Sequence, residues 1–155
     1  MPPASGPDVR HALFRRRVDA WLGADLDAYM DCWADDMVID LPSGRIVGKE
    51  RYRKLVQAGF SWAAPVAFDV HHIATVDWAT VDWATVDWAS VDRASVDRAN
   101  VDGGDVVLAD WTIRARRRDD GFVVGWLGLS VCEFRAGKIA WWREHHLAPP
   151  APVAL

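Results

Sequence analysis

The sequence holds few of the residue types that mark a special class of protein. It has two cysteines among 155 residues, Cys32 and Cys132, too few for a disulfide framework or a zinc motif. It has no apolar run near the ~20 residues that a membrane helix needs, and its first residues lack the apolar core of a signal peptide. We therefore expect a cytoplasmic protein that has no membrane partner.

The sequence also has no large excess of charge of either sign. Its 22 acidic residues slightly outnumber its 18 lysines and arginines, which does not favour nucleic acid as a partner. Apolar residues make up 51% of the chain and include 10 tryptophans. A chain of this length and composition can bury a sizeable core, so we expect residues 1–155 to form one domain.

A tandem repeat interrupts the middle of the chain. Over residues 74–103 a five-residue unit occurs six times, as ATVDW three times, ASVDR twice and ANVDG once. Period five matches neither a strand nor a helix, and six units are too few for a stack of pentapeptide-repeat coils. We therefore interpret 74–103 as an insertion within a β-hairpin. It would form a projecting arm or a mobile loop, whose tryptophans offer a surface for association.

Outside the repeat, the spacing of apolar residues predicts three helices followed by long strands. Residues 10–22 place most apolar side chains on one helical face, with Arg17 inside that arc. A second helix follows Asp25, and the stretch MVIDL reads as a short strand. The remaining predicted elements are a helix over about 49–60 and strands from about 66, over 105–117, over 121–135 and over 138–146. This order is typical of an α+β fold with helices gathered on one face of a curved antiparallel sheet.

Three stretches of the chain are similar to one known superfamily. RRRVDAWLGADLDAYMDCWADDMVIDLPSG, IVGKERYRKLV and SVCEFRAGKIAWWREHHLAP resemble the nuclear transport factor two-like superfamily. Within it they are nearest to the SnoaL-like proteins, ketosteroid isomerase and limonene-epoxide hydrolase. The resemblance covers about residues 10–149 apart from the repeat, and it implies a cone-shaped sheet wrapped around the N-terminal helices, an apolar pocket and a homodimer. The superfamily hosts isomerases, cyclases, hydrolases and non-catalytic binders, so the resemblance does not select one reaction.

Asp40 is the first candidate for chemistry. It shares a predicted strand face with Val38, and the resemblance places it where ketosteroid isomerase keeps its general-base carboxylate. A carboxylate at the mouth of an apolar pocket is poorly solvated, which raises its pKa into a range useful for moving protons. The alternative is a solvated aspartate that caps the turn beside Pro42.

Three further side chains are candidates for a catalytic role. Arg17 stands, by the resemblance, where the isomerase has its oxyanion-binding phenol, and a guanidinium there could hold an anionic oxygen. His72 continues a predicted apolar strand face and is expected to point inward as a proton carrier. His145 and His146 lie on opposite faces of the last strand, and the sequence leaves open which of them faces the pocket; His145 completes the candidate set. The alternatives are an Arg17 paired with a carboxylate and a His72 in the core or at its rim.

The residues present depart from both best-known catalytic sets of the superfamily. The isomerase set needs a phenol and a protonated carboxylic acid, and Arg17 and Cys132 stand at the matching positions. The limonene-type hydrolase uses an Asp-Arg-Asp set, and Trp111, Ile113 and Leu147 stand in its place. The sequence therefore favours neither reaction in its known form.

The predicted substrate-binding residues are mainly large and apolar, which implies a hydrophobic, ring-containing ligand. They are Tyr29, Trp33, Trp111, Trp126, Cys132 and Phe134. For any one of these side chains the alternative is ordinary packing in the core or in a dimer interface.

These observations predict a cofactor-independent enzyme of the isomerase, cyclase or lyase type, without a metal site. It would move a proton on a small hydrophobic metabolite such as a polyketide or terpenoid. The alternative is a non-catalytic small-molecule-binding or assembly module of the same fold. An open cavity with polar groups at its wall would favour the enzyme, and a cone filled by side chains would favour the module.

Overall fold

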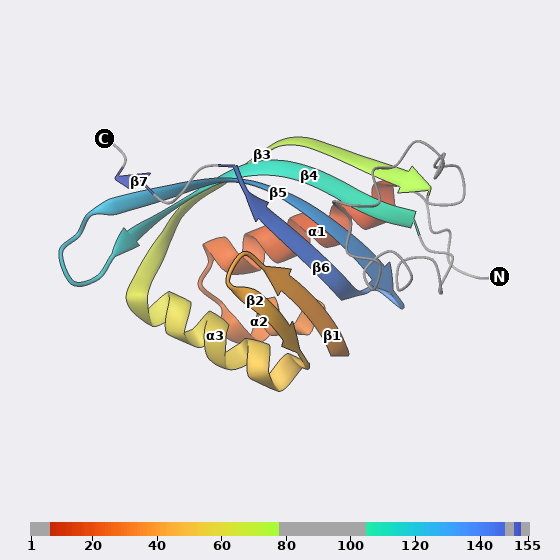
Figure 1. Ribbon diagram of the computed structural model, residues 1–155, viewed down its shortest axis with the longest axis horizontal. Coiled ribbons are helices and arrows are strands. Elements are labelled where there is room, and N and C mark those ends of the chain that lie inside the picture. The colour runs from red at the N-terminus through yellow and green to blue at the C-terminus, as the bar shows by residue number, and fades with distance from the viewer. Residues whose placement is uncertain (1–6, 78–104, 148–150, 153–155) are drawn as a thin grey trace.

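The computed structural model describes residues 7–77, 105–147 and 151–152, and it confirms the expected α+β class (Figure 1). The elements follow the predicted order closely. They are α1 (Pro7–Leu22), α2 (Leu26–Asp31), β1 (Trp33–Leu41), β2 (Gly44–Val47), α3 (Lys49–Trp62), β3 (Ala63–Asp77), β4 (Asp105–Arg117), β5 (Val123–Arg135), β6 (Lys138–His146) and β7 (Ala151–Pro152). No helix among these elements is long and apolar enough to cross a membrane.

The strands form one mixed, mostly antiparallel sheet. Its strand order is β2-β1-β6-β5-β4-β3, and the short β7 pairs with β5. The pairing of β1 with β6 is parallel, and the other pairings are antiparallel. The long strands β3, β4 and β5 bend over α1, so that the helices lie on the concave side of the sheet (Figure 1).

Local sequence explains where the first two helices end and begin. Helix α1 ends before Gly23, whose N–H bonds to the carbonyl of Asp19, and Ala24 then takes a positive φ of 49°. Asp25 caps α2 by accepting a hydrogen bond from the backbone N–H of Ala28 at 3.0 Å. The tight α1–α2 connection brings the apolar faces of both helices against the same side of the sheet.

The core lies between α1 and the concave face of the sheet, and aromatic rings dominate it. Phe14 of α1 stacks on Trp142 of β6, with ring centroids 5.6 Å apart. The ring centroid of Trp33 lies 5.8 Å from that of the same indole, and the ring centroids of Phe68 and Trp111 are 5.5 Å apart. Rings of this size remove a large apolar area from water, so they account for much of the stabilisation of the fold.

Two β-bulges decide which side chains reach this core. In β3, Val70 pairs with Trp111 and His72 pairs with Asp110, so that His71 is an extra residue. The two-residue alternation is therefore reset, and Ile73 rather than His72 packs against the core. A second irregularity, where β5 pairs with β6 around Glu133, likewise resets which residues of β6 face inward.

The strands that flank the repeat pair with each other. Strand β3 pairs with β4 as far as Asp77 with Asp105, as expected for the two arms of a hairpin. Residues 78–104 lie outside the described residues, so the insertion predicted for 74–103 stays a prediction beyond Asp77. The single domain with its core at about 10–149 and the homodimer also stay predictions.

Gly128 of β5 permits the close packing of Trp111. A Cβ added at Gly128 would lie 2.3 Å from the indole ring of Trp111. We expect Gly128→Ala to lower the free energy of unfolding by about 1–3 kcal/mol, because the ring must move or the strand must shift. Urea denaturation measures this change.

Gly59→Ala provides the control for that substitution. No atom lies within 4 Å of a Cβ added at Gly59, which is in α3. Since alanine favours a helix over glycine, this variant should unfold at the same or a slightly higher urea concentration. A Gly128→Ala protein as stable as the wild type would contradict the packing argument.

Candidate functional site

A cavity of about 480 Å³ opens between the helices and the concave face of the sheet. Most of its wall is apolar, and aromatic side chains predominate. The lining residues are Arg17, Trp21, Tyr29, Leu41, Pro42, Ser43, Tyr52, Leu55, Val56, Gly59, Phe60, Trp62, Ala63, Phe68, Trp111, Ile113, Ala115, Trp126, Glu144 and His146. The cone is therefore not filled by its own side chains, and a few polar groups stand on an apolar wall.

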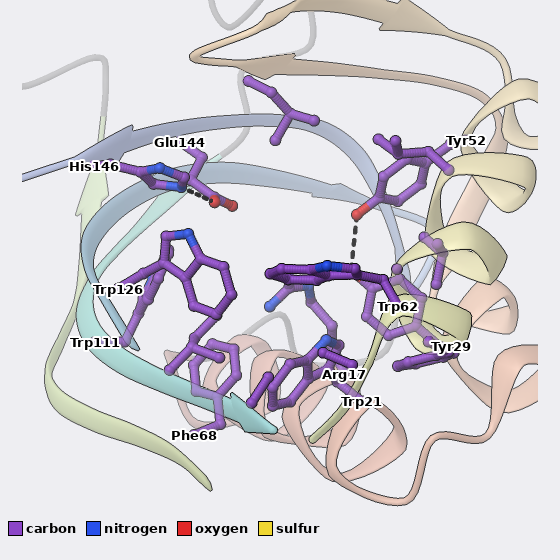
Figure 2. Close-up of a pocket in the computed structure, with 18 of the residues that line it drawn as sticks. Arg17, Trp21, Tyr29, Tyr52, Trp62, Phe68, Trp111, Trp126, Glu144 and His146 are labelled. Carbon is purple, nitrogen blue, oxygen red and sulfur yellow. Dashed lines mark hydrogen bonds and ion pairs between the residues drawn. The ribbon is translucent and has the colours of Figure 1, made fainter. Parts of the chain in front are cut away.

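Glu144 and His146 form a hydrogen-bonded pair on this wall (Figure 2). Both side chains come from the inner face of β6, two residues apart, so the strand presents them together. The Nε2 atom of His146 lies 2.8 Å from Oε1 of Glu144, and the indole N–H of Trp142 donates to Oε2 of Glu144 at 3.1 Å. An ionised Glu144 accepts both bonds. It therefore holds the proton of a neutral His146 on Nε2 and leaves Nδ1 as a proton acceptor.

Arg17 brings a buried positive charge to the same cavity. Its residue is 4% exposed, and its guanidinium carbon lies 4.0 Å from the ring centroid of Trp142. Neither Nε nor Nη1 has a hydrogen-bond partner among the described residues. Burial by itself would lower the pKa of Arg17, but the neighbouring Tyr29, Tyr52 and Glu144 outweigh that effect and raise it. The guanidinium is thus a permanent cation with unused donors.

Two tyrosine hydroxyls lie beside Arg17. The hydroxyls of Tyr29 and Tyr52 are 2.8 Å apart, so one donates to the other. Burial raises the pKa of Tyr29, and burial together with Tyr29 raises the pKa of Tyr52 well above its ordinary value, although Arg17 opposes both shifts. Both phenols therefore stay protonated near neutral pH and serve as hydrogen-bonding groups rather than as bases.

Asp40 lies beside the cavity rather than on its wall. Its neighbour Leu41 lines the cavity, whereas Asp40 lines an adjoining pocket, which shares Glu144 and His146 with the cavity, and pairs with Arg45 at 2.6 Å. Partial burial would raise the pKa of Asp40, but hydrogen bonds from Arg45 and Trp141 and the charges of Arg45 and Arg143 outweigh it and lower the pKa. The expected raised pKa is therefore wrong, because cations surround the carboxylate.

Two predicted histidines also point away from the cavity. His72 was expected to face inward, but its side chain is 86% exposed and its Nδ1 lies 2.9 Å from Asp110. The bulge at His71 turns it outward. His145 is exposed and lines the adjoining pocket with Asp40, whereas His146 lines both that pocket and the cavity.

The predicted substrate-binding residues divide into two groups. Tyr29, Trp111 and Trp126 line the cavity. Trp33 and Cys132 are buried in the core, Phe134 packs against that core, and none of these three lines the cavity. Burial raises the pKa of the Cys132 thiol, which does not favour a nucleophilic role.

Most of the residues that line the cavity were not predicted as site residues from the sequence, among them Glu144, Tyr52, Phe68 and Trp62. Strict alternation along β6 does join Trp142, Glu144 and His146 on one face, and Trp142 is fully buried against Phe14. The large apolar Trp142 was therefore the available signal that Glu144 and His146 face inward. For Tyr52 and Trp62 the signal is weaker, because α3 presents them from a helix that also packs on the core.

Within the described residues, no group of three or more His, Cys, Asp or Glu side chains is arranged to hold a metal ion. The polar side chains that line the cavity are those of Arg17, the two tyrosines, Ser43, Glu144 and His146.

Comparison with known proteins finds similarity in family and in fold. The SnoaL-like domain family matches residues 14–142. No curated protein matches the chain.

Among solved structures, an LEH-like epoxide hydrolase from M. tuberculosis has 18% identity and a TM-score of 0.63, covering 90% of this chain and 83% of its own. A ketosteroid isomerase-like protein from Erwinia carotovora has 16% identity and a TM-score of 0.63, covering 94% and 99%. A candidate polyketide cyclase from Xanthomonas campestris has 17% identity and a TM-score of 0.59, covering 88% and 89%. At such identities these likenesses show the fold alone.

The lowered pKa of Asp40 predicts a pH-dependent contribution to stability. A carboxyl whose folded-state pKa lies below its unfolded value stabilises the fold above that value, and this stabilisation is lost as pH falls through the folded pKa. We expect Asp40→Asn to lower the urea midpoint at pH 7, and the difference from wild type to shrink below about pH 4. Urea unfolding at a series of pH values measures it.

The exposed Asp19 of α1 provides a matched control for this measurement. Asp19→Asn should leave the midpoint nearly unchanged at pH 7, as surface substitutions generally do. A difference between wild type and Asp40→Asn that grows toward low pH would contradict the assignment of the ion pair.

Proposed function

The chain belongs to the SnoaL-like domain family and has the nuclear transport factor two-like fold, and on that premise we propose that it is an enzyme that transfers a proton on a small hydrophobic metabolite. The reaction would be of the isomerase, cyclase or lyase type, on a ring-containing compound such as a polyketide or terpenoid. The observation that carries the proposal is the joint presence of a buried cation and a Glu–His pair in one apolar cavity. A proton transfer of this kind requires no cofactor.

His146 acts as the general base in this proposal. With Nε2 bonded to Glu144, its Nδ1 accepts a proton from a carbon or hydroxyl of the substrate and can return it elsewhere. Glu144 is a positioning residue: it orients the imidazole and stabilises the imidazolium that forms. The surrounding apolar wall excludes water, which keeps the transferred proton within the site.

Arg17 holds the substrate oxygen that carries negative charge. Its permanent charge beside the cavity suits an enolate, a phenolate or another oxyanion. Tyr29 and Tyr52 extend this polar region with protonated hydroxyls. Base and cation therefore stand on different wall segments, one from β6 and one from α1, with space for a substrate between them (Figure 2).

Epoxide hydrolysis of the limonene type is not favoured by the same cavity. By the resemblance, Trp111 and Ile113 stand where that reaction needs charged groups, and both line the cavity. Leu147 stands at the third such position, and its side chain is exposed rather than in the cavity.

Hydrogen exchange on a simple ketone tests the proposed chemistry. We expect the wild-type protein to accelerate exchange of the ring hydrogens beside the carbonyl of 2-tetralone and 1-tetralone in D2O, measured by proton NMR against buffer. His146→Gln should reduce the acceleration by about 10²–10⁴-fold, because the general base is lost. Glu144→Gln should reduce it less, because the amide oxygen can still accept the Nε2 proton.

The outer face of the sheet offers matched controls for these variants. His145→Gln and Asp40→Asn change a histidine and a carboxylate that do not line the cavity, although they line a neighbouring pocket that Glu144 and His146 also line. Because neither side chain touches the proposed substrate space, we expect both variants to retain the exchange rate of the wild type. Wild-type protein that binds the ketones but does not accelerate exchange would contradict the enzyme and support the non-catalytic binding module. Loss of exchange in the outer-face variants alone would contradict the assignment of His146.

A further inference from the structure

Arg17 lines the cavity as a cation whose neighbours, among the described residues, are aromatic rings and the hydroxyl of Tyr29, to which it is hydrogen-bonded, rather than an ion-pair partner. Its guanidinium carbon lies within 6 Å of the ring centroids of four side chains, at 4.0 Å from Trp142, 5.4 Å from Tyr29, 5.7 Å from Phe68 and 5.9 Å from Trp33. Ring faces attract a cation, but they do not accept its N–H groups as an oxygen does. Nε and Nη1 have no partner among the described residues.

The carboxylate of the cavity does not supply that missing partner. Both oxygens of Glu144 are engaged, one by His146 and the other by the indole of Trp142. The charge of Glu144 acts on Arg17 only from a distance, as one of the influences that raise its pKa. Arg17 nevertheless lines the cavity, so a ligand bound there would lie beside it (Figure 2).

We propose that the cavity binds fused-ring aromatic compounds as anions, with an ionised oxygen of the ligand at Arg17. This inference rests on the proposed function in one respect, that the cavity is the ligand site. A guanidinium is charged at every stage of a reaction, so it complements an oxygen that is already ionised when the ligand binds. A hydrogen bond between two ions is stronger than one to a neutral carbonyl, which would leave the buried cation uncompensated.

The cavity wall selects the remainder of the ligand. Aromatic side chains supply eight of its lining residues, namely Trp21, Tyr29, Tyr52, Phe60, Trp62, Phe68, Trp111 and Trp126. Flat rings stack on such walls with little loss of contact area. The volume of about 480 Å³ accommodates two or more fused rings together with a charged substituent.

The two charges of the cavity also set the direction of binding. Arg17 attracts the anionic oxygen and Glu144 repels it, so the charged end of the ligand lies beside Tyr29 and Tyr52. The uncharged rings then extend toward Trp111, whose ring centroid lies 6.4 Å from that of His146. This orientation brings the carbon skeleton, rather than the charged oxygen, to the proposed base.

A pair of ligands of equal shape tests the inference by binding alone. The probes are 2-naphthoate and 2-naphthamide, which differ in charge but not in ring system. We expect the wild-type protein at pH 7.5 to bind the naphthoate at least about tenfold more tightly, measured by calorimetry and by shifts of the tryptophan indole signals in NMR titrations. Arg17→Met should abolish this preference or reverse it, because a neutral side chain of similar length replaces the cation.

Arg15→Met provides the control, since Arg15 is an exposed arginine of the same helix. That variant should keep the preference of the wild type, which separates the buried cation from a general change in charge. Even if Arg17→Met does not fold, the ratio of the affinities of the wild-type protein for the two probes still tests the inference. A wild-type protein that binds both probes equally, prefers the amide, or shows no binding of naphthoate in the millimolar range would overturn the inference.

This result is independent of the exchange assay for the proposed function. A preference for naphthoate without any acceleration of hydrogen exchange would support the anion site and contradict the enzyme. Acceleration of exchange without that preference would support the enzyme and contradict the anion site.

Discussion

Burial of one guanidinium against one indole connects the core of this protein to its cavity. Trp142 stacks on Phe14 and also lies 4.0 Å from the guanidinium carbon of Arg17. A cation removed from water is costly unless its surroundings compensate it. Here ring faces and two phenols provide part of that compensation, and Nε and Nη1 of Arg17 have no hydrogen-bond partner among the described residues. The same rings that stabilise the fold therefore also give the cavity a polar end.

The inner and outer faces of the sheet place similar residues in opposite electrostatic settings. On the outer face Asp40 is held ionised by arginines, which lower its pKa. On the inner face Glu144 is engaged by a histidine and an indole in a largely apolar cavity. A carboxylate surrounded by cations is stabilised in one protonation state, whereas a carboxylate that orients a histidine supports proton transfer through its partner. The face of the sheet on which an acidic residue lies, more than its residue type, therefore decides whether it can take part in chemistry.

Much of the architecture could be predicted from local pattern. The helical spacing of residues 10–22, the cap at Asp25 and the alternation after Pro65 predicted α1, α2 and β3, whereas β2 was not predicted and β1 begins before the stretch MVIDL. The resemblance to the SnoaL-like group predicted the correct family. Of the predicted site residues, Arg17, Tyr29, Trp111 and Trp126 line the cavity, and their roles there stay predictions. Each of these residues lies in a helix or strand whose periodicity is not reset by a β-bulge before that residue.

The order of helices and strands, the curved α+β sheet and the burial of Arg17 on an apolar helix face could be inferred from the chain itself, because they depend on periodicity over many residues. The choice between His72 and Ile73, and between His145 and His146, depended on tertiary structure. An extra residue at His71 reverses the face on which the next residues of β3 lie, and the pairing of β6 with β5 and β1 selects its inner side. A strand repeats every two residues, so one inserted residue exchanges core for solvent. Such an insertion is visible only in the register between strands that are far apart in sequence.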